Sequence, residues 1–249
     1  MKALKELLSE LTFTCERGNL EKEITAVVYD SRKIVEGCLF VCIKGANFDG
    51  HQAAAEAAEK KAAAIIVSQE VVELPKQSET TLIRVEDTRY ALAFVSAAWF
   101  DHPAKKLTTI GITGTKGKTT TTYLVKSILE NAGRKVGLVG TIEIIIGDTH
   151  IHAVNTTPES YLLQEYFAKM VESGCDTVVM EVSSQALMLH RTQGFVFDFG
   201  IFTNLEPDHI GPNEHGSFEE YAHCKSLLFQ QCRVGIANCD DVHWQLIPK

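Results

Sequence analysis

The sequence has no excess of positive charge, because 24 Lys and Arg stand against 32 Asp and Glu and give a formal net charge of −8 at pH 7. Nucleic acids and anionic membranes usually require a basic face on the proteins that bind them, so we expect neither as a partner. The sequence also has no run of about 18 apolar residues that could span a bilayer, and its first residues do not form the apolar core of a secretory signal. We therefore expect a cytoplasmic protein without membrane insertion.

A cysteine framework is missing as well. The seven cysteines are scattered and form no C-x-x-C pair, so we expect reduced, mostly structural thiols. What the chain does have is the composition of a globular protein, with 45% apolar and 22% charged residues. Its 249 residues are enough for one large domain or two ordinary ones, and length alone does not decide between them.

Strand-like and helix-like segments alternate in the first part of the chain. The predicted strands are 24–29, 38–43, 64–67 and 81–85, and the predicted helices are 52–63 and 88–100. Residues 101–106, which contain Pro103 and several charges, predict a linker. We therefore expect a small N-terminal α/β domain over 1–104 and a second domain over 105–249.

From residue 107 onward the alternation becomes regular. The predicted strands are 107–112, 136–139, 177–182, 197–203 and 234–237, and the predicted helices are 118–131, 160–172 and 218–232. Near-continuous apolar strands between helices are typical of a mostly parallel sheet flanked by helices, so the predicted fold class is α/β. The last strand should be followed by further sheet and helix, and we expect the second domain to be incomplete at residue 249.

A glycine-rich turn lies between a predicted strand and a predicted helix, which is the context that makes a phosphate loop credible. The predicted nucleotide-binding residues are Gly114, Thr115, Lys116, Gly117, Lys118, Thr119 and Thr120. Glycines let successive N–H groups point at phosphate oxygens, and the helix adds its positive end. Lys118 would neutralise charge between the outer phosphates, and Thr119 would offer its hydroxyl to Mg²⁺.

The turn is a variant of the usual phosphate-loop pattern. Ile112 occupies the place of the first glycine, and Gly111 stands one position further back, so we read the loop from Gly111 to Thr119. The alternative is a structural Gly-Thr turn without a ligand. Against it, the sequence GKTT at the start of an amphipathic helix has little structural rationale.

Four further polar features lie near predicted strand ends or helix starts. Glu181 ends an otherwise apolar strand, which is where nucleotide-binding folds place a magnesium ligand, although a mere solvent contact is the alternative. The turn Asn155-Thr156-Thr157-Pro158 precedes a helix and is able to contact phosphate or sugar, or simply to cap that helix. His209 follows the strand 197–203 at the edge where ligands bind in such folds. Lys225 lies on a helix, where a lysine is usually a solvated surface charge.

Taken together, these residues resemble the Mur ligases, a family that builds the bacterial cell-wall precursor by joining amino acids to a UDP-linked muramoyl peptide. The resemblance covers nearly the whole chain. It rests on the segments TGTKGKTT from Thr113, NTTP from Asn155, MEVSS from Met180, HR from His190, TNL from Thr203 with Asp208 and His209, KSLLF from Lys225, DSR from Asp30 and DG from Asp49. Within the family, the set is most similar to the ligases that add the third residue of the stem peptide.

The resemblance implies a UDP-binding N-terminal domain, a P-loop ATPase domain and a C-terminal amino-acid-binding domain that this chain lacks. It implies that the catalytic residues are Lys118, Glu181, His209 and Lys225, with Lys225 carbamylated so that a cation becomes a carboxylate-like ligand. The implied Mg²⁺ ligands are Thr119, Glu181, His209 and the carbamylated Lys225. The implied substrate-binding residues are Tyr29, Ser31, Asn47, Asn155, Thr156, Thr157, Ser183 and Arg191.

The resemblance also implies a reaction and its partners. A carboxylate of the UDP-N-acetylmuramoyl dipeptide would attack the γ-phosphate of ATP, and the amine of a free amino acid would then attack the resulting acyl phosphate. The cofactors expected are ATP and Mg²⁺, and we expect a monomer. A folylpolyglutamate synthetase, a non-catalytic nucleotide-binding or UDP-sugar-binding module, and a ligand-binding fragment with little turnover are the alternatives. The N-terminal segment with Asp30-Ser31-Arg32 argues against the first.

Overall fold

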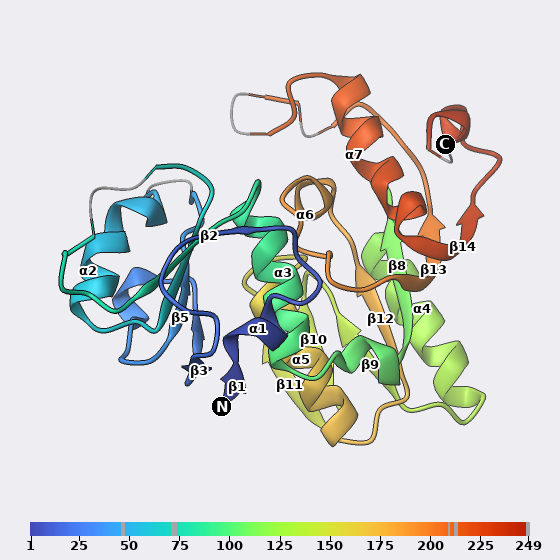
Figure 1. Cartoon of the computed structure of the whole chain (residues 1–249). Coiled ribbons are helices and arrows are strands. Elements are labelled where there is room, and N and C mark those ends of the chain that lie inside the picture. Colours follow the sequence, from blue (N-terminus) through green and yellow to red (C-terminus); the bar gives the residue numbers. More distant parts are fainter. Residues whose placement is uncertain (46–47, 71–73, 209, 212–213, 248–249) are drawn as a thin grey trace. The chain divides into compact units, whose positions relative to one another are not determined.

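The computed structural model describes residues 1–45, 48–70, 74–208, 210–211 and 214–247. The chain forms two compact units, Met1–Asp101 and His102–Lys249, whose elements are labelled in Figure 1. Asp101 and His102 both have positive φ, of 59° and 49°, so the backbone bends where the units meet in the sequence. The predicted boundary after residue 104 lies a little further on, inside the 3₁₀ helix η3 (Pro103–Lys106).

Unit 1 is built on a five-stranded sheet with the order β2-β7-β6-β5-β4. Its strands are β2 (Thr14–Arg17), β4 (Val27–Val28), β5 (Leu39–Val41), β6 (Ala64–Val67) and β7 (Thr81–Arg84), and its longer helices are α2 (Ala54–Glu59) and α3 (Thr88–Trp99). All neighbours pair in parallel except β2, which runs antiparallel to β7. The buried alanines of α2 let this helix approach the sheet closely, beside Phe40 and Ile65.

Two predictions for unit 1 need correction. The predicted strand 24–29 is two strands, because Ile24 pairs with Lys2 in a small separate sheet whereas Val27 pairs with Leu39 in the main one. The small sheet consists of β1 (Lys2–Ala3), which leads into α1 (Leu4–Leu7), and β3 (Glu23–Ile24). The predicted helix 52–63 is also shorter, because the 3₁₀ helix η2 (Gly50–Ala53) precedes α2 and Lys61, with φ of 59°, follows it.

Unit 2 contains a seven-stranded sheet with the order β11-β10-β9-β12-β8-β13-β14. Its strands are β8 (Thr108–Thr113), β9 (Val136–Val139), β10 (Glu143–Ile146), β11 (Thr149–His152), β12 (Thr177–Glu181), β13 (Phe197–Phe202) and β14 (Cys232–Ala237). Its helices are α4 (Lys118–Asn131), α5 (Ser160–Glu172), α6 (Ser184–Met188) and α7 (Phe218–Gln230). The five strands from β9 to β14 in this order are parallel, which confirms the predicted mostly parallel α/β sheet.

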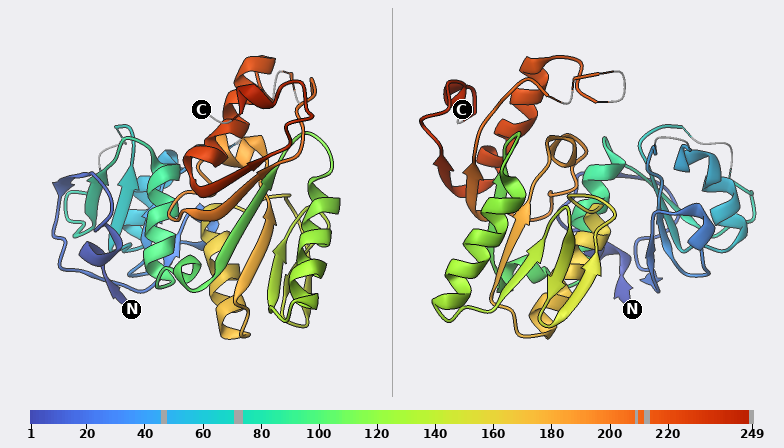
Figure 2. Two further views of the ribbon diagram at one scale, coloured as in Figure 1. Left: turned by 90° about the vertical axis from the view of Figure 1, so that its right-hand side faces the viewer. Right: turned by 180° about the vertical axis from the view of Figure 1, so that it is seen from behind.

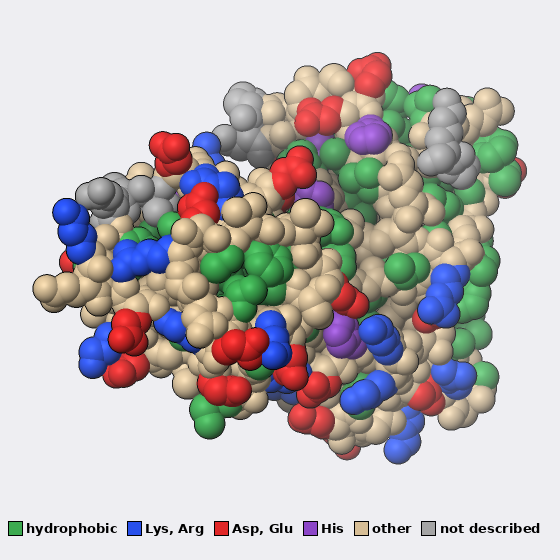
Figure 3. Space-filling model, viewed as in Figure 1, with side chains coloured by type: hydrophobic (Ala, Val, Ile, Leu, Met, Phe, Trp, Pro, Cys, Tyr) green, Lys and Arg blue, Asp and Glu red, His purple; other side chains and the backbone are tan. Residues whose placement is uncertain are grey.

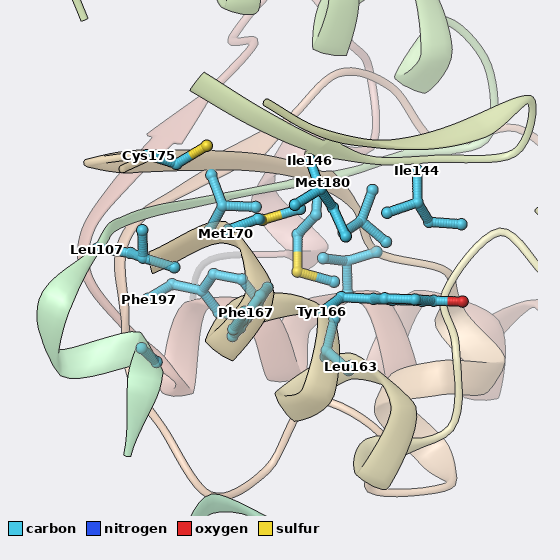
Figure 4. Packing of buried hydrophobic residues seen from close by; sticks show 14 of the residues in the cluster. Leu107, Ile144, Ile146, Leu163, Tyr166, Phe167, Met170, Cys175, Met180 and Phe197 are labelled. Atoms are coloured by element: carbon cyan, nitrogen blue, oxygen red, sulfur yellow. The ribbon is translucent and has the colours of Figure 1, made fainter. Parts of the chain in front are cut away.

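Helices cover both sides of the unit 2 sheet, and Figure 2 shows α4 and α5 on opposite faces of it. Val178 and Met180 of β12 pack in a cluster with Phe167 and Met170 of α5, which Figure 4 shows from close by. Val179, between them, packs in another cluster with apolar residues of α4. A strand that is covered on both faces consists of a continuous run of apolar residues, and this run allowed β12 to be predicted from the sequence.

The antiparallel edge of this sheet was not predicted. Strands β10 and β11 form a hairpin around Gly147, whose φ is +55°, and β10 adds antiparallel to β9. Three buried isoleucines form β10, whereas β11 is mostly exposed and polar. The short helix α6 was missed as well. Of the helices that the described residues form, none is long and apolar enough to cross a bilayer.

Strand β14 is the last strand of the sheet at the other edge. Its residues Val234 and Ile236 are each 48% exposed. Figure 3 shows hydrophobic side chains gathered along the right-hand side of the face that it draws. The sheet therefore presents apolar side chains toward solvent at its β14 edge.

Candidate functional site

The turn between β8 and α4 contains two glycines in backbone conformations that other residues rarely adopt. Gly114 has φ of +148° and Gly117 has φ of +82°. A Cβ at Gly114 would lie 1.9 Å from Thr203 Oγ1, so the turn leaves no room for a side chain there. Gly111 lies within β8, where a Cβ would be 2.9 Å from the Phe197 ring. Its placement at the start of the loop was therefore wrong, since packing within the sheet explains this glycine.

Asn204, just after β13, holds the turn in place. Its backbone oxygen accepts a hydrogen bond from Thr115 N at 2.9 Å, and its side-chain Oδ1 accepts one from Lys116 N at 2.8 Å. These two N–H groups are thus engaged within the protein. The first N–H groups of α4, from Lys118 to Thr120, have no partner within the helix and lie at its positive end. They are the loop donors best suited to receive an anion.

Lys118 is the first residue of α4, and its side chain folds back over the turn. Its Nζ donates to the carbonyl oxygens of Gly114 at 2.9 Å and Thr115 at 3.0 Å. Burial lowers the pKa of Lys118, and the carboxylates of Glu181 and Asp208 oppose that shift. The turn therefore holds an amine against its own carbonyl groups, beside the helix donors.

Glu181 ends β12 beside this turn, with only 1% of its surface exposed. Its Oε2 accepts a hydrogen bond from Thr119 Oγ1 at 2.9 Å, and its Oε1 accepts one from Thr141 N at 2.8 Å. A Cβ at Gly140 would lie 2.6 Å from Oε1, so the backbone approaches the carboxylate closely. Within the described part of the chain, no lysine, arginine or histidine forms an ion pair with Glu181.

The pair of Thr119 and Glu181 fits a hard divalent cation. A hydroxyl and a carboxylate supply the oxygen ligands that Mg²⁺ prefers, and a buried carboxylate without an ion-pair partner has negative charge that a cation would compensate. The described residues include no group of three or more His, Cys, Asp and Glu side chains that could hold a metal by themselves. His209, a predicted ligand, lies outside the described residues.

Lys225 of α7 contacts the same turn. It is 1% exposed, its Nζ donates to Gly114 O at 2.8 Å, and it lies 4.4 Å from the centre of the Tyr221 ring. Burial, with a smaller contribution from Lys118, lowers the pKa of Lys225 to about 7. A far larger share of this amine is therefore neutral near physiological pH than of a solvated surface lysine. The alternative of an ordinary surface charge is thus wrong for Lys225.

Tyr221 connects α7 to the turn and was not identified from the sequence. Its hydroxyl donates to Thr115 Oγ1 at 3.1 Å, and its side chain is fully buried. Spacing offers a partial signal in retrospect, because Tyr221 and Lys225 are four residues apart and share one face of the helix. An aromatic residue at that spacing is usually a core residue, and nothing in the sequence marks it as a neighbour of the turn.

The polar turn before α5 is bound to the end of β12. Thr157 Oγ1 donates to the backbone oxygen of Glu181 at 2.9 Å and accepts from Ser183 N at 3.1 Å. Arg191 Nη1 donates to Thr157 O at 3.2 Å. Thr156 Oγ1 lies 3.1 Å from Thr141 Oγ1. The structure thus gathers these predicted residues around Glu181.

Two other predicted substrate residues of unit 2 have simpler surroundings. Asn155 is exposed at the start of the turn. Ser183 caps α6, and its Oγ accepts a hydrogen bond from Ala186 N at 3.1 Å. His215, which was not predicted, is buried. Its Nε2 lies 2.8 Å from Oγ of Ser184, the first residue of α6.

Of the predicted residues of unit 1, the two that the structure describes follow a strand of its sheet. Tyr29 and Ser31 follow β4 and are half-buried, and Asp30 forms an ion pair of 2.8 Å with Arg32. Asn47 lies outside the described residues. His51 was not identified from the sequence, and it is only 6% exposed. Its Nδ1 lies 2.6 Å from Asp49 Oδ1, and its Nε2 accepts a hydrogen bond from Ser68 N at 3.1 Å.

Comparisons with known proteins agree with this arrangement of elements. Residues 112–248 match the family description "Mur ligase middle domain", and residues 23–99 match "Mur ligase family, catalytic domain". A UDP-N-acetylmuramoyl-L-alanyl-D-glutamate–2,6-diaminopimelate ligase from Clostridium perfringens is 46% identical over 246 residues, which are 99% of this chain and 50% of that protein.

Solved structures show the same fold. A structure titled as a ligase of that same name superposes with a TM-score of 0.80 at 24% identity, covering 99% of this chain and 49% of the other. A MurF ligase from Thermotoga maritima in complex with ADP gives a TM-score of 0.51 at 23% identity, covering 87% and 46%. The chain thus spans about half the length of the relatives that it matches. With more than half of its residues matched by the middle-domain description, the chain belongs to the Mur ligase family.

Proposed function

We propose that this chain carries the ATP-activating and UDP-substrate-binding parts of an ATP-dependent ligase. The ligase would add 2,6-diaminopimelate, as the third residue, to UDP-N-acetylmuramoyl-L-alanyl-D-glutamate. One observation carries the proposal: two lysine amines, of Lys118 and Lys225, donate to the same carbonyl of Gly114 in a glycine turn. Beside that turn, the buried carboxylate of Glu181 accepts a hydrogen bond from Thr119.

The names of the relatives support the choice of substrate. The Clostridium perfringens relative is named for the diaminopimelate reaction, and the match extends over 99% of this chain. The ADP complex of the Thermotoga maritima neighbour supports ATP as the nucleotide. Family membership of residues 23–99 also argues against a folylpolyglutamate synthetase.

The chemistry needs charge compensation more than a covalent nucleophile. A substrate carboxylate attacks the γ-phosphate of ATP, and the amine of the amino acid then displaces phosphate from the acyl phosphate. Carboxylate and triphosphate repel each other, so a cation has to lie between them. Lys118 supplies one positive charge, and bound Mg²⁺ would supply the remainder of the charge compensation. Thr119 and Glu181 would hold that ion.

The buried amine of Lys225 is suited to carbamylation. Only a neutral amine attacks CO₂, and burial keeps much of this amine neutral near pH 7. The new N–C bond forms as the amine loses a proton, and the product is an anionic carbamate with two oxygen atoms. That anion would be an oxygen ligand of a second Mg²⁺, which His209 would also contact, while Thr119 and Glu181 would serve the first.

Substrate contacts complete the proposal. We assign the UDP-muramoyl dipeptide to Tyr29, Ser31, Asn47, Asn155, Thr156, Thr157, Ser183 and Arg191. We assign ATP to the turn and the first residues of α4. We further propose that the protein acts in the cytoplasm as a monomer, with no nucleic acid or membrane partner.

Equilibrium binding tests the proposal on the purified chain. We expect it to bind Mg²⁺-ATP and, separately, UDP-N-acetylmuramoyl-L-alanyl-D-glutamate in isothermal titration calorimetry. Lys118→Ala should weaken ATP binding about 100-fold, because a buried charge that meets the phosphates is lost, while leaving the UDP substrate bound. Lys169→Ala is the matched control, since its amine pairs with Glu165 at the surface of α5, outside the turn, and ATP binding should stay near wild type.

Two outcomes would overturn the proposal. If the chain binds no UDP-muramoyl dipeptide, the substrate assignment is wrong. If Lys118→Ala weakens both ligands equally, the turn is not the nucleotide site. A separate assay of diaminopimelate ligation measures turnover, and steady ligation would exclude the alternative that the 249-residue chain only binds its ligands.

A further inference from the structure

Thr141 is a residue of unit 2 that contacts Glu181 with both its backbone and its side chain. It follows β9, which lies next to β12 in the sheet. Its N–H donates to Glu181 Oε1 at 2.8 Å, and its Oγ1 lies 3.1 Å from Glu181 Oε2. Each oxygen of the carboxylate therefore has a partner in Thr141.

The hydroxyl of Thr141 also meets the hydroxyl of Thr156, at 3.1 Å. A hydroxyl has one proton to donate, whereas an ionised carboxylate can only accept. The proton of Thr141 therefore points to Glu181, and Thr156 donates its own proton to Thr141. The result is a directed chain of two hydrogen bonds from Thr156 through Thr141 to the carboxylate.

Glu181 is held by the same polar turn at its backbone. Thr157 Oγ1 donates to Glu181 O at 2.9 Å, while Thr156 reaches the carboxylate through Thr141. Two successive residues of the turn thus fix the two ends of one glutamate. If a metal takes the Thr119 hydroxyl that now donates to Oε2, Thr141 keeps its contacts with both carboxylate oxygens.

We propose that Thr141 is a positioning residue that couples the turn 155–157 to the carboxylate of Glu181. A polar substrate group that binds the turn at Thr156 would hold Thr141 and Glu181 in the orientation that receives Mg²⁺-nucleotide, and the reverse would hold equally. This inference rests on the proposed function. It adds to that function a physical connection through which the UDP-linked substrate and the nucleotide favour each other.

The position of Thr141 makes a clean test possible. Its side chain is exposed, so a substitution there removes no core packing. Thr141→Val keeps the shape and the N–H contact but removes the hydroxyl, and Thr141→Ala is a second hydroxyl-free variant. Thr141→Ser restores the hydroxyl. Thr149→Val, at an exposed threonine of β11, is the matched control for the exchange of a hydroxyl for a methyl group.

The measurement is a Mg²⁺ titration of the binding of a fluorescent ATP analogue to the full chain. We expect Thr141→Val and Thr141→Ala to raise the half-saturating Mg²⁺ concentration about five- to tenfold, a typical effect of losing a hydrogen bond to a charged group. Thr141→Ser and Thr149→Val should stay within about twofold of wild type. Far-UV circular dichroism and melting temperature confirm folding of each variant.

The substrate link needs a second measurement on the same proteins. UDP-N-acetylmuramoyl-L-alanyl-D-glutamate should lower the half-saturating Mg²⁺ concentration of the wild type, and Thr141→Val should remove most of that decrease. Thr156→Val should reproduce the loss, and the double variant should lose no more than either single one. Additive effects in this cycle, or an unchanged Mg²⁺ titration of both hydroxyl-free variants, would overturn the inference while leaving the proposed function intact. A wild type that binds no Mg²⁺-nucleotide would overturn both.

Discussion

The two parallel sheets place polar residues at their strand ends in opposite electrostatic states. In unit 1, the carboxylates near β4 and β5 already have partners: Asp30 forms an ion pair of 2.8 Å with Arg32, and Asp49 Oδ1 lies 2.6 Å from Nδ1 of His51. In unit 2, Glu181 is buried without an ion pair to a described residue, and the Lys225 amine is buried against a carbonyl. The unit 1 groups are satisfied by direct partners, whereas in unit 2 Glu181 interacts with the charge of Lys118 without forming an ion pair, so that a bound cation would add to its compensation.

The buried groups of unit 2 lower the stability of the fold, and a ligand would compensate them. A buried carboxylate and a buried amine each cost free energy when no partner compensates them. Such groups are rare in the interior of a protein and tend to mark functional sites. Paired surface charges, in contrast, contribute little either way. Substitutions of the buried groups of unit 2 should therefore separate stability from ligand binding, whereas substitutions of the paired groups of unit 1 test stability.

The largest effect should come from Glu181→Gln. The amide keeps the shape and can still meet the hydroxyls of Thr119 and Thr141, but it removes the negative charge. We expect Mg²⁺-dependent nucleotide binding to fall at least about 100-fold, while the melting temperature stays equal or rises. Titration calorimetry and thermal melting measure the two effects. Glu206→Gln, at a carboxylate paired with Lys116 at the surface, is the control and should change neither. A lower melting temperature without loss of binding would contradict the view of Glu181 as a ligand.

Lys225→Met should stabilise the protein near neutral pH. The folded pKa of Lys225 is about 7, below its ordinary value of 10.5, so between these values the unfolded chain binds a proton that the folded chain lacks. This group therefore makes stability rise with pH through that window, and its penalty is full below about pH 7. Lys225→Met also loses one hydrogen bond. Allowing for that loss, we expect the free energy of unfolding to rise by about 2–4 kcal/mol at pH 6–7.

Urea unfolding from pH 6 to 10 in buffer without bicarbonate measures this gain. The variant should also show a flatter dependence of stability on pH than the wild type. Bicarbonate should add the mass of a carbamate to the wild type in native mass spectrometry and not to Lys225→Met. Equal stability and equal pH dependence of the two proteins would show that the amine is solvated, contrary to its burial.

Helices and most strands of unit 2 could be predicted because their signals are local. The predicted bounds of α4 and α5 are those observed, since each helix begins at a cap or a turn and has one apolar stripe. The hairpin β10–β11 was missed because β11 alternates poorly and is mostly exposed, so it lacks the apolar run of a buried strand. Strand 24–29 was misjudged because its two halves pair with different strands, which only the tertiary structure decides.

The residues of the site also differ in whether the sequence alone could predict them. Glu181 was predictable because a carboxylate at the end of an apolar strand has a functional meaning by itself. Thr141 and Asn204 were not, because Thr141 reaches Glu181 through the pairing of β9 with β12, and Asn204 reaches the turn through the pairing of β13 with β8. A threonine or asparagine after a strand is an ordinary turn residue, and sequence alone does not show which strands become neighbours.

A smaller effect should follow from His51→Ala in unit 1. Burial alone would raise the pKa of Asp49, but hydrogen bonds from His51 and Gln69 outweigh it and hold that pKa below its ordinary value. The Asp49 contribution to stability is therefore present above about pH 4 and is lost as pH falls through the lower folded pKa. We expect His51→Ala to lower the free energy of unfolding by about 1–3 kcal/mol at pH 7 and by less in acid. Urea unfolding at pH 7 and pH 3 tests this, and an equal loss at both values would assign the effect to packing instead.

The smallest effect should come from Arg32→Ala, which completes the contrast between the two units. Arg32 forms an ion pair with Asp30, which is only two residues away in the sequence, yet the Arg32 side chain is 86% exposed. Water and salt screen such a pair, so its removal should leave the melting temperature unchanged within error. Asp30 still accepts the backbone N–H of residue 32, at 3.1 Å, and that bond keeps the turn at Ser31 in place. A drop of several degrees would mean that the charges of unit 1 carry stability after all, and the difference between the two strand-end regions would then be one of degree.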